Sequence, residues 1–286
     1  AEYGTVMVER FLFFFMAKLY PFSIACSNFA PCRISSFIRS LISNIWIYGV
    51  IGFGVVFCSI FGWFLPRKWH IFWWGRMMCP AVMWGMKVFG GLSIEVRGKQ
   101  YLRGKVIYAC KHESAAETYF LAAIVDKATM VLKKELTYIP FFGWAQAMYG
   151  LIPVDRSAGA SAMKKMLIGA KKMMSTGRSL IIFPEGHRVP AGTNIKYKPG
   201  FLFLAQNLKL PVVPVALNSG MFWPRSSFKH LPGKIIVEFM PPIDVSGDKN
   251  ESIEKIQKCI EDKCYELNHE AMRDYPACKV NYFGKD

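Results

Sequence analysis

A chain of 286 residues is long enough for one sizeable α/β domain with a small appendage, and no long Pro/Gly/Ser linker marks a second domain. The 36 basic residues outnumber the 20 acidic ones, and a net charge of +16 predicts attraction to nucleic acid, anionic lipid or phosphorylated substrates. No helix-turn-helix, zinc-finger or RNP pattern supports nucleic acid as a partner. The eight cysteines include no C-x-x-C pair, which favours reduced thiols over a disulfide framework.

Residues 1–40 are interpreted as a poorly specified N-terminal extension. Its apolar run FLFFFMA is soon interrupted by Lys18 and Pro21. A signal peptide is one alternative, but no clean small-residue cleavage site follows the apolar run. We expect no functional residue in this segment.

The most apolar stretch of the chain comes next and predicts a membrane-embedded helix. No charged residue occurs between Arg39 and Arg67, and the stretch from Leu41 to Leu65 exceeds the roughly 20 apolar residues needed to cross about 30 Å of hydrocarbon. A buried core helix is the alternative, but core helices are rarely this long or this apolar on every face. This stretch contributes strongly to the mean hydropathy of +0.21.

The stretch from Trp69 to Gly91 mixes four Trp and four Met with Arg76 and Lys87. It is too polar to span a membrane and too apolar to be solvated, which favours an interfacial helix. The return arm of a helical hairpin and a plain core helix remain alternatives. Residues 41–91 are therefore expected to form a transmembrane or interfacial helical anchor. The basic residues that follow the first helix indicate that the rest of the chain faces the cytoplasm, at the cytoplasmic (inner) membrane.

From residue 92 onward, short β-branched runs alternate with longer helical patterns, which predicts an α/β fold. We expect a mostly parallel central sheet flanked by helices over residues 92–286. The expected strands are 92–98, 106–111, 128–134, 151–156, 179–186, 212–217 and 234–242. The expected helices begin at Ser114 or cover 141–148, 158–175, 200–208 and 251–272.

The ends of strands carry function in open parallel sheets, and the segment HESAAE follows such a strand directly. His112 opens this segment, Ser114 is suited to cap a helix, and Glu117 falls in the first turn of that helix. The carboxylate can then fold back to the imidazole, fix its tautomer and leave the other ring nitrogen to take a proton from a substrate hydroxyl. The alternative is a surface His beside a Glu that merely favours the helix dipole.

Two further strand ends supply cations. Arg156 follows LIPVD, and Arg188 ends the segment PEGHR; both are forked donors suited to bidentate phosphate binding. Gly186 allows a tight turn, while Glu185 can orient Arg188 or bind an acceptor hydroxyl. An exposed turn with an incidental ion pair is the alternative. Three lysines are candidates for weaker charge contributions: Lys111, Lys196 and Lys198.

Together these segments resemble the glycerolipid acyltransferases, typified by 1-acyl-sn-glycerol-3-phosphate acyltransferase. KHESAAET resembles the H-x4-D block of that family, and GLIPVDR resembles its G-x-x-P-x-x-R block. FPEGHR resembles the F-P-E-G-T-R block, and VVPVAL resembles the hydrophobic V-P-[VI] block. The order and spacing of the blocks also agree, and the resemblance covers roughly residues 70–245.

The resemblance implies transfer of a fatty acyl group from a thioester, acyl-CoA or acyl-carrier protein, to the free hydroxyl of lysophosphatidic acid at a membrane lipid bilayer. His112 is then the general base, and Glu117 holds it and balances its charge. Glu185, Gly186 and Arg188 form the site for the glycerol phosphate of the acceptor. Arg156 helps to neutralise that phosphate. No cofactor beyond the thioester co-substrate and no metal site are expected.

Two departures from the family pattern affect these expectations. Glu117 replaces the usual Asp, so its longer side chain has to retract by about one methylene to keep the same hydrogen bond. His187 replaces the usual Thr and leaves the choice of acceptor headgroup open. The alternatives are therefore an acyltransferase acting on another lysolipid and, from a different class, a membrane-tethered basic module that binds lipid without catalysis.

Overall fold

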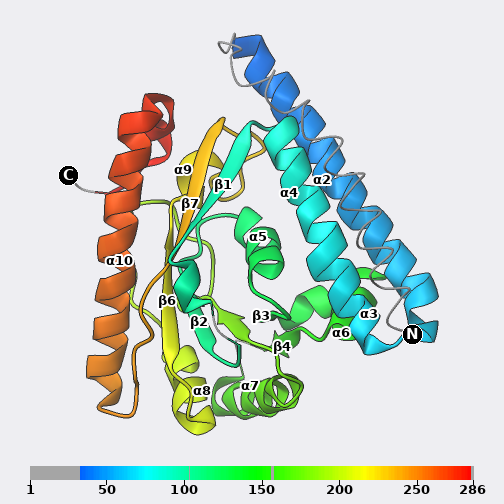
Figure 1. The fold of residues 1–286 in the computed structure, drawn as a ribbon, viewed down its shortest axis with the longest axis vertical. Helices are drawn as coiled ribbons and strands as arrows, with labels where there is room; N and C mark the ends of the chain where they lie inside the picture. Colours follow the sequence, from blue (N-terminus) through cyan, green and yellow to red (C-terminus); the bar gives the residue numbers. More distant parts are fainter. Residues whose placement is uncertain (1–32, 103, 156–157, 285–286) are drawn as a thin grey trace.

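The computed structural model describes residues 33–102, 104–155 and 158–284, and its centre is a seven-stranded sheet with the strand order β1-β7-β6-β2-β5-β3-β4 (Figure 1). The strands are β1 (Leu92–Arg97), β2 (Ile107–Cys110), β3 (Thr129–Lys133), β4 (Ile152–Val154), β5 (Leu180–Ile182), β6 (Val212–Leu217) and β7 (Gly233–Phe239). All neighbouring strands are parallel except β6 and β7, which pair antiparallel. The predicted α/β fold with a mostly parallel sheet is confirmed.

Helices cover both faces of this sheet. They are α2 (Arg33–Phe61), α3 (Arg67–Phe72), α4 (Cys79–Val88), α5 (Ala116–Ile124), α6 (Phe142–Tyr149), α7 (Gly159–Met174), α8 (Gly200–Leu208), α9 (Ser219–Phe222) and α10 (Lys249–Asp274). A π-helical turn, η3 (Trp73–Met78), joins α3 to α4, and short 3₁₀ turns are η2 (Gly62–Phe64), η4 (Lys99–Tyr101), η5 (Lys134–Tyr138) and η6 (Pro276–Asn281). The observed strands and helices lie close to the expected segments after residue 92.

Strand β2 shows why the sheet is covered on both faces. Tyr108 and Cys110 pack into a core shared with α4 and α5, whereas Ile107 and Ala109 pack into a second core shared with α7, α8 and α10. A strand buried on both sides reads as a continuous apolar run, as VIYAC does. The carboxyl ends of β2, β3, β4 and β5 therefore meet at one edge of the sheet, where the predicted functional segments begin.

The segment from Trp69 to Gly91 is the return arm of a helical hairpin, one of the alternatives that the sequence left open. Helix α4 runs beside α2 (Figure 1), and Trp46 donates from Nε1 to Ala81 O at 2.9 Å. The two helices approach closely because Gly85 leaves room for the Trp46 ring; a Cβ there would lie 1.9 Å from Trp46 Cδ1. The other side of α4 packs into the core of the sheet.

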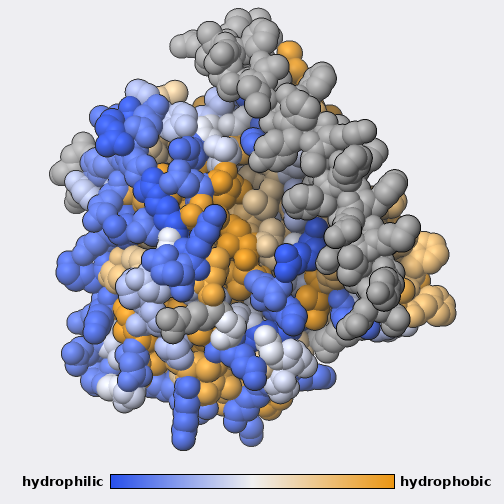
Figure 2. Space-filling model, in the orientation of Figure 1, coloured by the Kyte–Doolittle hydropathy of each residue, from blue (hydrophilic) through white to orange (hydrophobic). Residues whose placement is uncertain are grey.

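Helix α2 begins before the expected start at Leu41, and residues 1–32 of the expected extension lie outside the described residues. Within the described part of the chain, the one helix long and apolar enough to cross a membrane runs from Ser36 to Phe64. One side of α2 is exposed and apolar. On the other side of the molecule, the surface over α10 is largely hydrophilic (Figure 2). The exposed apolar side chains of α2 are Phe37, Ile38, Leu41, Ile42, Ile45, Tyr48, Phe53, Val56, Ile60 and Phe61.

A buried arginine ties the start of β3 to the end of α6 at the amino edge of the sheet, opposite the edge where the predicted functional segments begin. Arg178 has 1% of its surface exposed, and its guanidinium donates to Lys127 O at 3.1 Å and to Ala128 O and Tyr149 O. It also lies 4.6 Å from the centre of the Tyr149 ring. The carbonyl of Tyr149 at the C-terminal end of α6, which has no partner within the helix, is satisfied in this way.

Replacing this arginine tests the connection. Because Arg178→Met leaves buried carbonyl groups without donors, we expect it to lower the free energy of unfolding by about 3 kcal/mol. Thermal unfolding of the purified chain in detergent, followed by circular dichroism, measures the change. The exposed Arg273→Met is the matched control and should leave the unfolding temperature unchanged; equal stability of both variants would contradict the assignment.

Candidate active site

The structure brings His112 and Glu117 into direct contact. His112 lies in the loop after β2, and α5 begins at Ala116, whose backbone N–H donates to Ser114 Oγ at 3.2 Å. Glu117 therefore sits in the first turn of α5, and its Oε2 lies 2.5 Å from His112 Nδ1. This is the arrangement that the HESAAE segment predicts.

The carboxylate of Glu117 is fully buried and fixed by other donors. Its Oε1 accepts from the backbone N–H groups of Glu113 at 2.8 Å and Ser114 at 2.6 Å, and from the hydroxyl of Ser219. An ionised carboxylate only accepts hydrogen bonds, so His112 Nδ1 carries the proton and Nε2 is the basic nitrogen. Sequence analysis did not identify Ser219, which begins α9 directly after the VVPVAL strand and Asn218.

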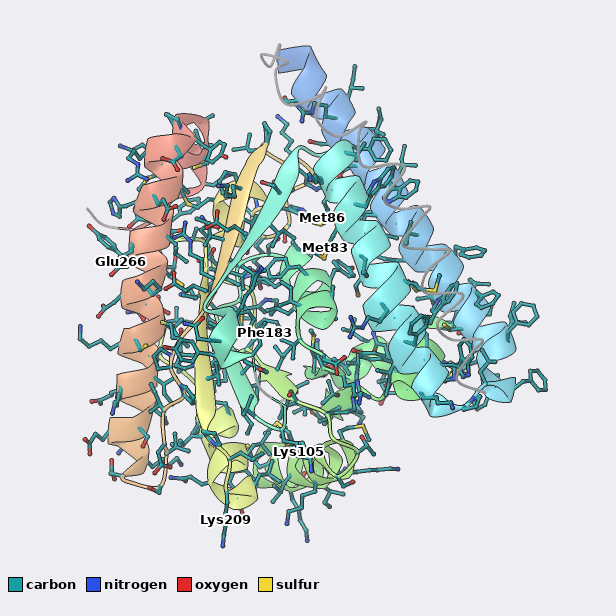
Figure 3. The ribbon with its side chains drawn as sticks, viewed as in Figure 1. Met83, Met86, Lys105, Phe183, Lys209 and Glu266 are labelled. Carbon is teal, nitrogen blue, oxygen red and sulfur yellow. The ribbon has the colours of Figure 1, made fainter. Side chains whose placement is uncertain are left out.

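The ring of His112 also has a fixed orientation. It stacks on Phe183, with ring centroids 3.9 Å apart and an interplanar angle of 20°. Phe183 follows β5 and lies near the centre of the molecule (Figure 3). The imidazole is thus held by a hydrogen bond at one edge and by an aromatic face, while 15% of its side chain remains exposed.

His112 lines a large, mainly apolar cavity of about 760 Å³. The wall of this cavity includes residues from α5, β3, η5, α6, α7 and α8. Its apolar lining includes Trp74, Tyr119, Met130, Leu132, Leu136, Phe142, Tyr149, Leu151, Met163, Met166, Ile182, Phe183 and Phe201. Its three lysines are Lys133, Lys198 and Lys249. The cavity combines an apolar interior with a basic nitrogen and cations, and only Lys198 of the three lysines was considered from the sequence.

The turn after β5 places Gly186 on the cavity but Glu185 behind it. Gly186 has a φ of +76°, and a Cβ at this position would lie 2.9 Å from Lys198 Nζ. The left-handed conformation favours glycine, and the absence of a side chain lets the Lys198 ammonium approach the turn. Glu185 has no exposed surface and is absent from the lining of the cavity.

Lys111 and Glu185 belong to a buried polar cluster rather than to the cavity wall. Lys111 Nζ donates to both oxygens of Glu261 on α10, at 2.7 and 2.8 Å, and to Thr193 O at 2.8 Å. Glu185 Oε1 lies 3.4 Å from the same ammonium. Lys111, expected as a contributor of charge to the phosphate, is thus engaged within the protein, because Glu261 is its closest partner.

Burial changes the protonation of this cluster. Loss of solvent raises the pKa of Glu185 to about 8, although the Lys111 ammonium acts to lower it. Burial alone would lower the pKa of Lys111, but Glu185 and Glu261 hold it above its usual value. Lys111 therefore lies between two carboxyl groups, with Glu261 as its closest partner, and burial disfavours the ionised form of Glu185.

The remaining predicted residues lie as follows. Arg188 is half-buried just beyond Gly186 and does not line the cavity. Tyr119 does line it; burial raises the pKa of Tyr119, and the positive charge of Arg188 acts to lower it. Arg156 lies outside the described residues. Within the described ranges no group of three or more His, Cys, Asp or Glu could hold a metal ion, and the expected lack of a metal site stays a prediction.

A carboxylate-held imidazole at the carboxyl edge of a parallel sheet, beside an apolar cavity, is an arrangement that can take a proton from a hydroxyl group close to an apolar chain. The family model described as "Acyltransferase" matches residues 93–218. The chain is 36% identical over 181 residues to the 1-acyl-sn-glycerol-3-phosphate acyltransferase of Pseudomonas aeruginosa, covering 63% of this chain and 70% of that protein. The chain therefore belongs to the acyltransferase family and is an enzyme.

Other relatives agree with this assignment. The 1-acyl-sn-glycerol-3-phosphate acyltransferase of Saccharomyces cerevisiae is 29% identical over 250 residues, which cover 83% of this chain and 80% of that protein. The crystal structure of the 1-acyl-sn-glycerophosphate (LPA) acyltransferase PlsC from Thermotoga maritima has the same fold, with a TM-score of 0.60. It is 21% identical and matches 82% of this chain and 95% of that chain.

Replacing Glu117 tests its role in orienting the base. Glu117→Gln keeps the size of the side chain but loses the negative charge that holds the protonated Nδ1, so we expect kcat to fall by about 100-fold or more, with little change in KM. Glu117→Asp keeps the charge and should restore part of the rate. Steady-state kinetics of acyl transfer measure both, and equal losses in the two variants would argue against an orienting carboxylate.

The buried carboxyl of Glu113, close to this site, should make the free energy of unfolding depend on pH. Glu113 is fully buried; its Oε2 accepts from Gly220 N at 2.9 Å, and burial raises its pKa to about 8, against a partly opposing effect of Lys111. Above the ordinary pKa the unfolded chain loses this proton while the folded chain keeps it. Stability from this group is therefore complete at acid pH and lost as the pH rises towards 8.

The variant Glu113→Gln cannot ionise and should not show this loss. Between about pH 5 and 8 we expect its free energy of unfolding to fall less steeply than that of the unmutated chain, by roughly 1 kcal/mol per pH unit. Denaturant unfolding at several pH values measures the slope. Parallel stability profiles of the two chains would show that Glu113 ionises normally in the folded state.

Proposed function

We propose that this enzyme transfers a fatty acyl group from an acyl thioester to the free hydroxyl of lysophosphatidic acid, forming phosphatidic acid in phospholipid biosynthesis. The observation that carries the proposal is the Glu117-held His112 on the wall of an apolar cavity of about 760 Å³. The acceptor is suggested by the names of the relatives, which are 1-acyl-sn-glycerol-3-phosphate acyltransferases.

The chemistry follows from the tautomer of His112. Its Nε2 takes the proton of the acceptor hydroxyl while the hydroxyl oxygen attacks the thioester carbonyl. The tetrahedral intermediate then expels the thiolate, which receives a proton from the imidazolium as the ester forms. Glu117 stabilises the imidazolium between these steps. A thioester already has a good leaving group, so the proposal requires neither an acyl-enzyme nor a bound cofactor or metal.

The apolar cavity is suited to an acyl chain, and its lysines are suited to the phosphate of the acceptor. Lys133 and Lys198 line the cavity that His112 lines, and Lys198 lies against Gly186. Arg188, just beyond this turn, and Arg156 add positive charge in our proposal. Because Glu185 is buried behind Gly186, we assign it the role of holding the turn through Lys111 rather than of touching the acceptor.

We propose that the apolar hairpin attaches the enzyme to a membrane, and the contacts of α2 support one orientation. Near one end of the helix, Asn44 donates to Phe228 O at 2.9 Å, and near the other end, Ser59 donates to Phe141 O at 2.8 Å. The domain thus flanks α2 along its length, and a perpendicular crossing would draw polar parts of the domain into hydrocarbon. We propose that the helix lies along one leaflet of the cytoplasmic membrane, facing a cytoplasmic donor, acyl-CoA or acyl-carrier protein.

A panel of acceptors tests the proposal. Membranes that contain the enzyme should transfer label from an acyl thioester to lysophosphatidic acid faster than to lysophospholipids with other headgroups. His112→Ala should reduce transfer by at least about 1,000-fold, because the base is lost, while leaving membrane association intact. Transfer only to another lysolipid would show that lysophosphatidic acid is not the acceptor. Unchanged activity of His112→Ala would show that His112 is not the general base.

A further inference from the structure

A segment of the catalytic domain outside the hairpin exposes large apolar side chains. It comprises residues 136–144, which are the end of η5, the short loop after it and the first turn of α6. Five of its side chains are between 37% and 68% exposed: Leu136, Tyr138, Ile139, Phe141 and Trp144. Single exposed apolar residues are common, but five within one short segment form a patch that calls for a partner.

The same segment forms part of the wall of the catalytic cavity. Leu136 and Phe142 line the cavity together with His112. Leu136 does so while 37% of its surface is exposed. The segment thus connects the apolar lining of the cavity with the exposed apolar side chains of residues 138–144.

The patch is continuous with the apolar hairpin. Phe141 O accepts from Ser59 Oγ of α2 at 2.8 Å, and Phe142 packs against Val55 and Cys58 of the same helix. Helix α6 lies beside α2 and α3, at the end of the hairpin that carries the turn (Figure 1). The turn of the hairpin is itself exposed and aromatic at Trp63, Phe64 and Trp69. Hairpin and segment thus present one apolar surface.

Charged residues border this surface at the start of η5. Lys133 and Lys134 are about half exposed; Lys133 lies 3.3 Å from Glu135, and Lys134 lies 3.5 Å from Asp155. Exposed pairs of this kind are weak, so both ammonium groups remain available to anionic headgroups. An apolar face bordered by lysines is the pattern of a surface that inserts into the boundary of a bilayer.

The backbone holds Phe141 in an uncommon conformation. Its φ is +61°, which a bulky residue rarely adopts, and Gly143 approaches Thr137 so closely that a Cβ would lie 2.0 Å from Thr137 O. Such a conformation persists only where the surrounding structure imposes it, and it is often found where a segment has a function. Here it ends a tight turn that leaves Phe141 and Trp144 at the surface.

We propose that residues 136–144 insert into the lipid bilayer beside the hairpin and form the wall past which lipid chains move between the bilayer and the catalytic cavity. The proposed insertion into the bilayer rests only on the exposed apolar side chains of residues 136–144 and the lysines beside them. The passage of chains rests on the proposed function, because it assumes that the cavity holds the acyl chain.

Fluorescence quenching tests insertion without requiring activity. Bimane is attached to Ile139→Cys or to the control Ile168→Cys, an exposed position on α7, in the full chain bound to phosphatidylethanolamine/phosphatidylglycerol vesicles. Signal from native thiols is subtracted using the labelled unmutated chain. Nitroxide on the lipid acyl chains should quench the label at 139 and leave the label at 168 nearly unchanged. Equal quenching at the two positions would overturn the insertion.

A charge substitution tests the passage of lipid chains. Ile139→Glu should lower transfer between long-chain substrates in vesicles by about tenfold, because a carboxylate resists insertion. It should leave transfer between short-chain, fully dissolved lysophosphatidic acid and acyl-CoA within about twofold, as should the control Ile168→Glu in both assays. Equal activity of Ile139→Glu and Ile168→Glu on vesicles would overturn the passage. An unmutated chain that is inactive on both substrate forms would instead refute the proposed function.

Discussion

The buried carboxylate of Glu117 is the point on which the geometry of the site depends. One of its oxygens binds His112, and the other accepts from two backbone N–H groups of the loop and from Ser219. These donors compensate for the loss of water around the charge, which would otherwise favour the neutral acid. The same bonds join the ends of β2 and β6 to the start of α5. The geometry of the loop and the orientation of the imidazole thus depend on one carboxylate.

Behind this carboxylate lie further buried acids with different partners. Lys111 is paired with Glu261, so α10 holds the loop after β2 from the side opposite the cavity. Glu113 and Glu185 are buried nearby, and loss of solvent raises the pKa of both. Raised pKa values reduce the repulsion that several buried negative charges would cause. Glu117 is the carboxylate in contact with His112.

Much of the fold could be predicted from the sequence because its signals are local. A buried strand followed by HESAAE specifies a loop and a helix start within a few residues, and the contact of His112 with Glu117 follows from that geometry. Ser219 could not be found this way, because it reaches Glu117 across the sheet. The burial of Glu185 depends likewise on Lys111 and α10. Motif residues next to each other in sequence, Glu185 and Gly186, face different environments, and only tertiary packing decides which of them reaches the cavity.

The packing of the hairpin likewise could not be predicted from local sequence signals. Composition identifies an apolar helix but not its neighbours, and Trp69 to Gly91 was compatible with three arrangements. The structure selects one through Gly85, where the missing side chain admits Trp46. The antiparallel pairing of β6 with β7 is also absent from the local pattern, since a strand reads the same in either direction. Pairing direction depends on where the connection runs, which periodicity does not encode.

Glu117 stands where the family pattern has Asp, and its contacts show how the longer side chain is held. The retraction by about one methylene stays a prediction; in the structure the side chain folds back over the loop. Its Oε1 reaches the N–H groups of Glu113 and Ser114, as the Glu of a capping box reaches back past a helix start. The carboxylate thus binds the loop and His112 simultaneously. A shorter acid in this backbone would hold the imidazole with fewer bonds to the loop, so here the loop and the Glu form one unit.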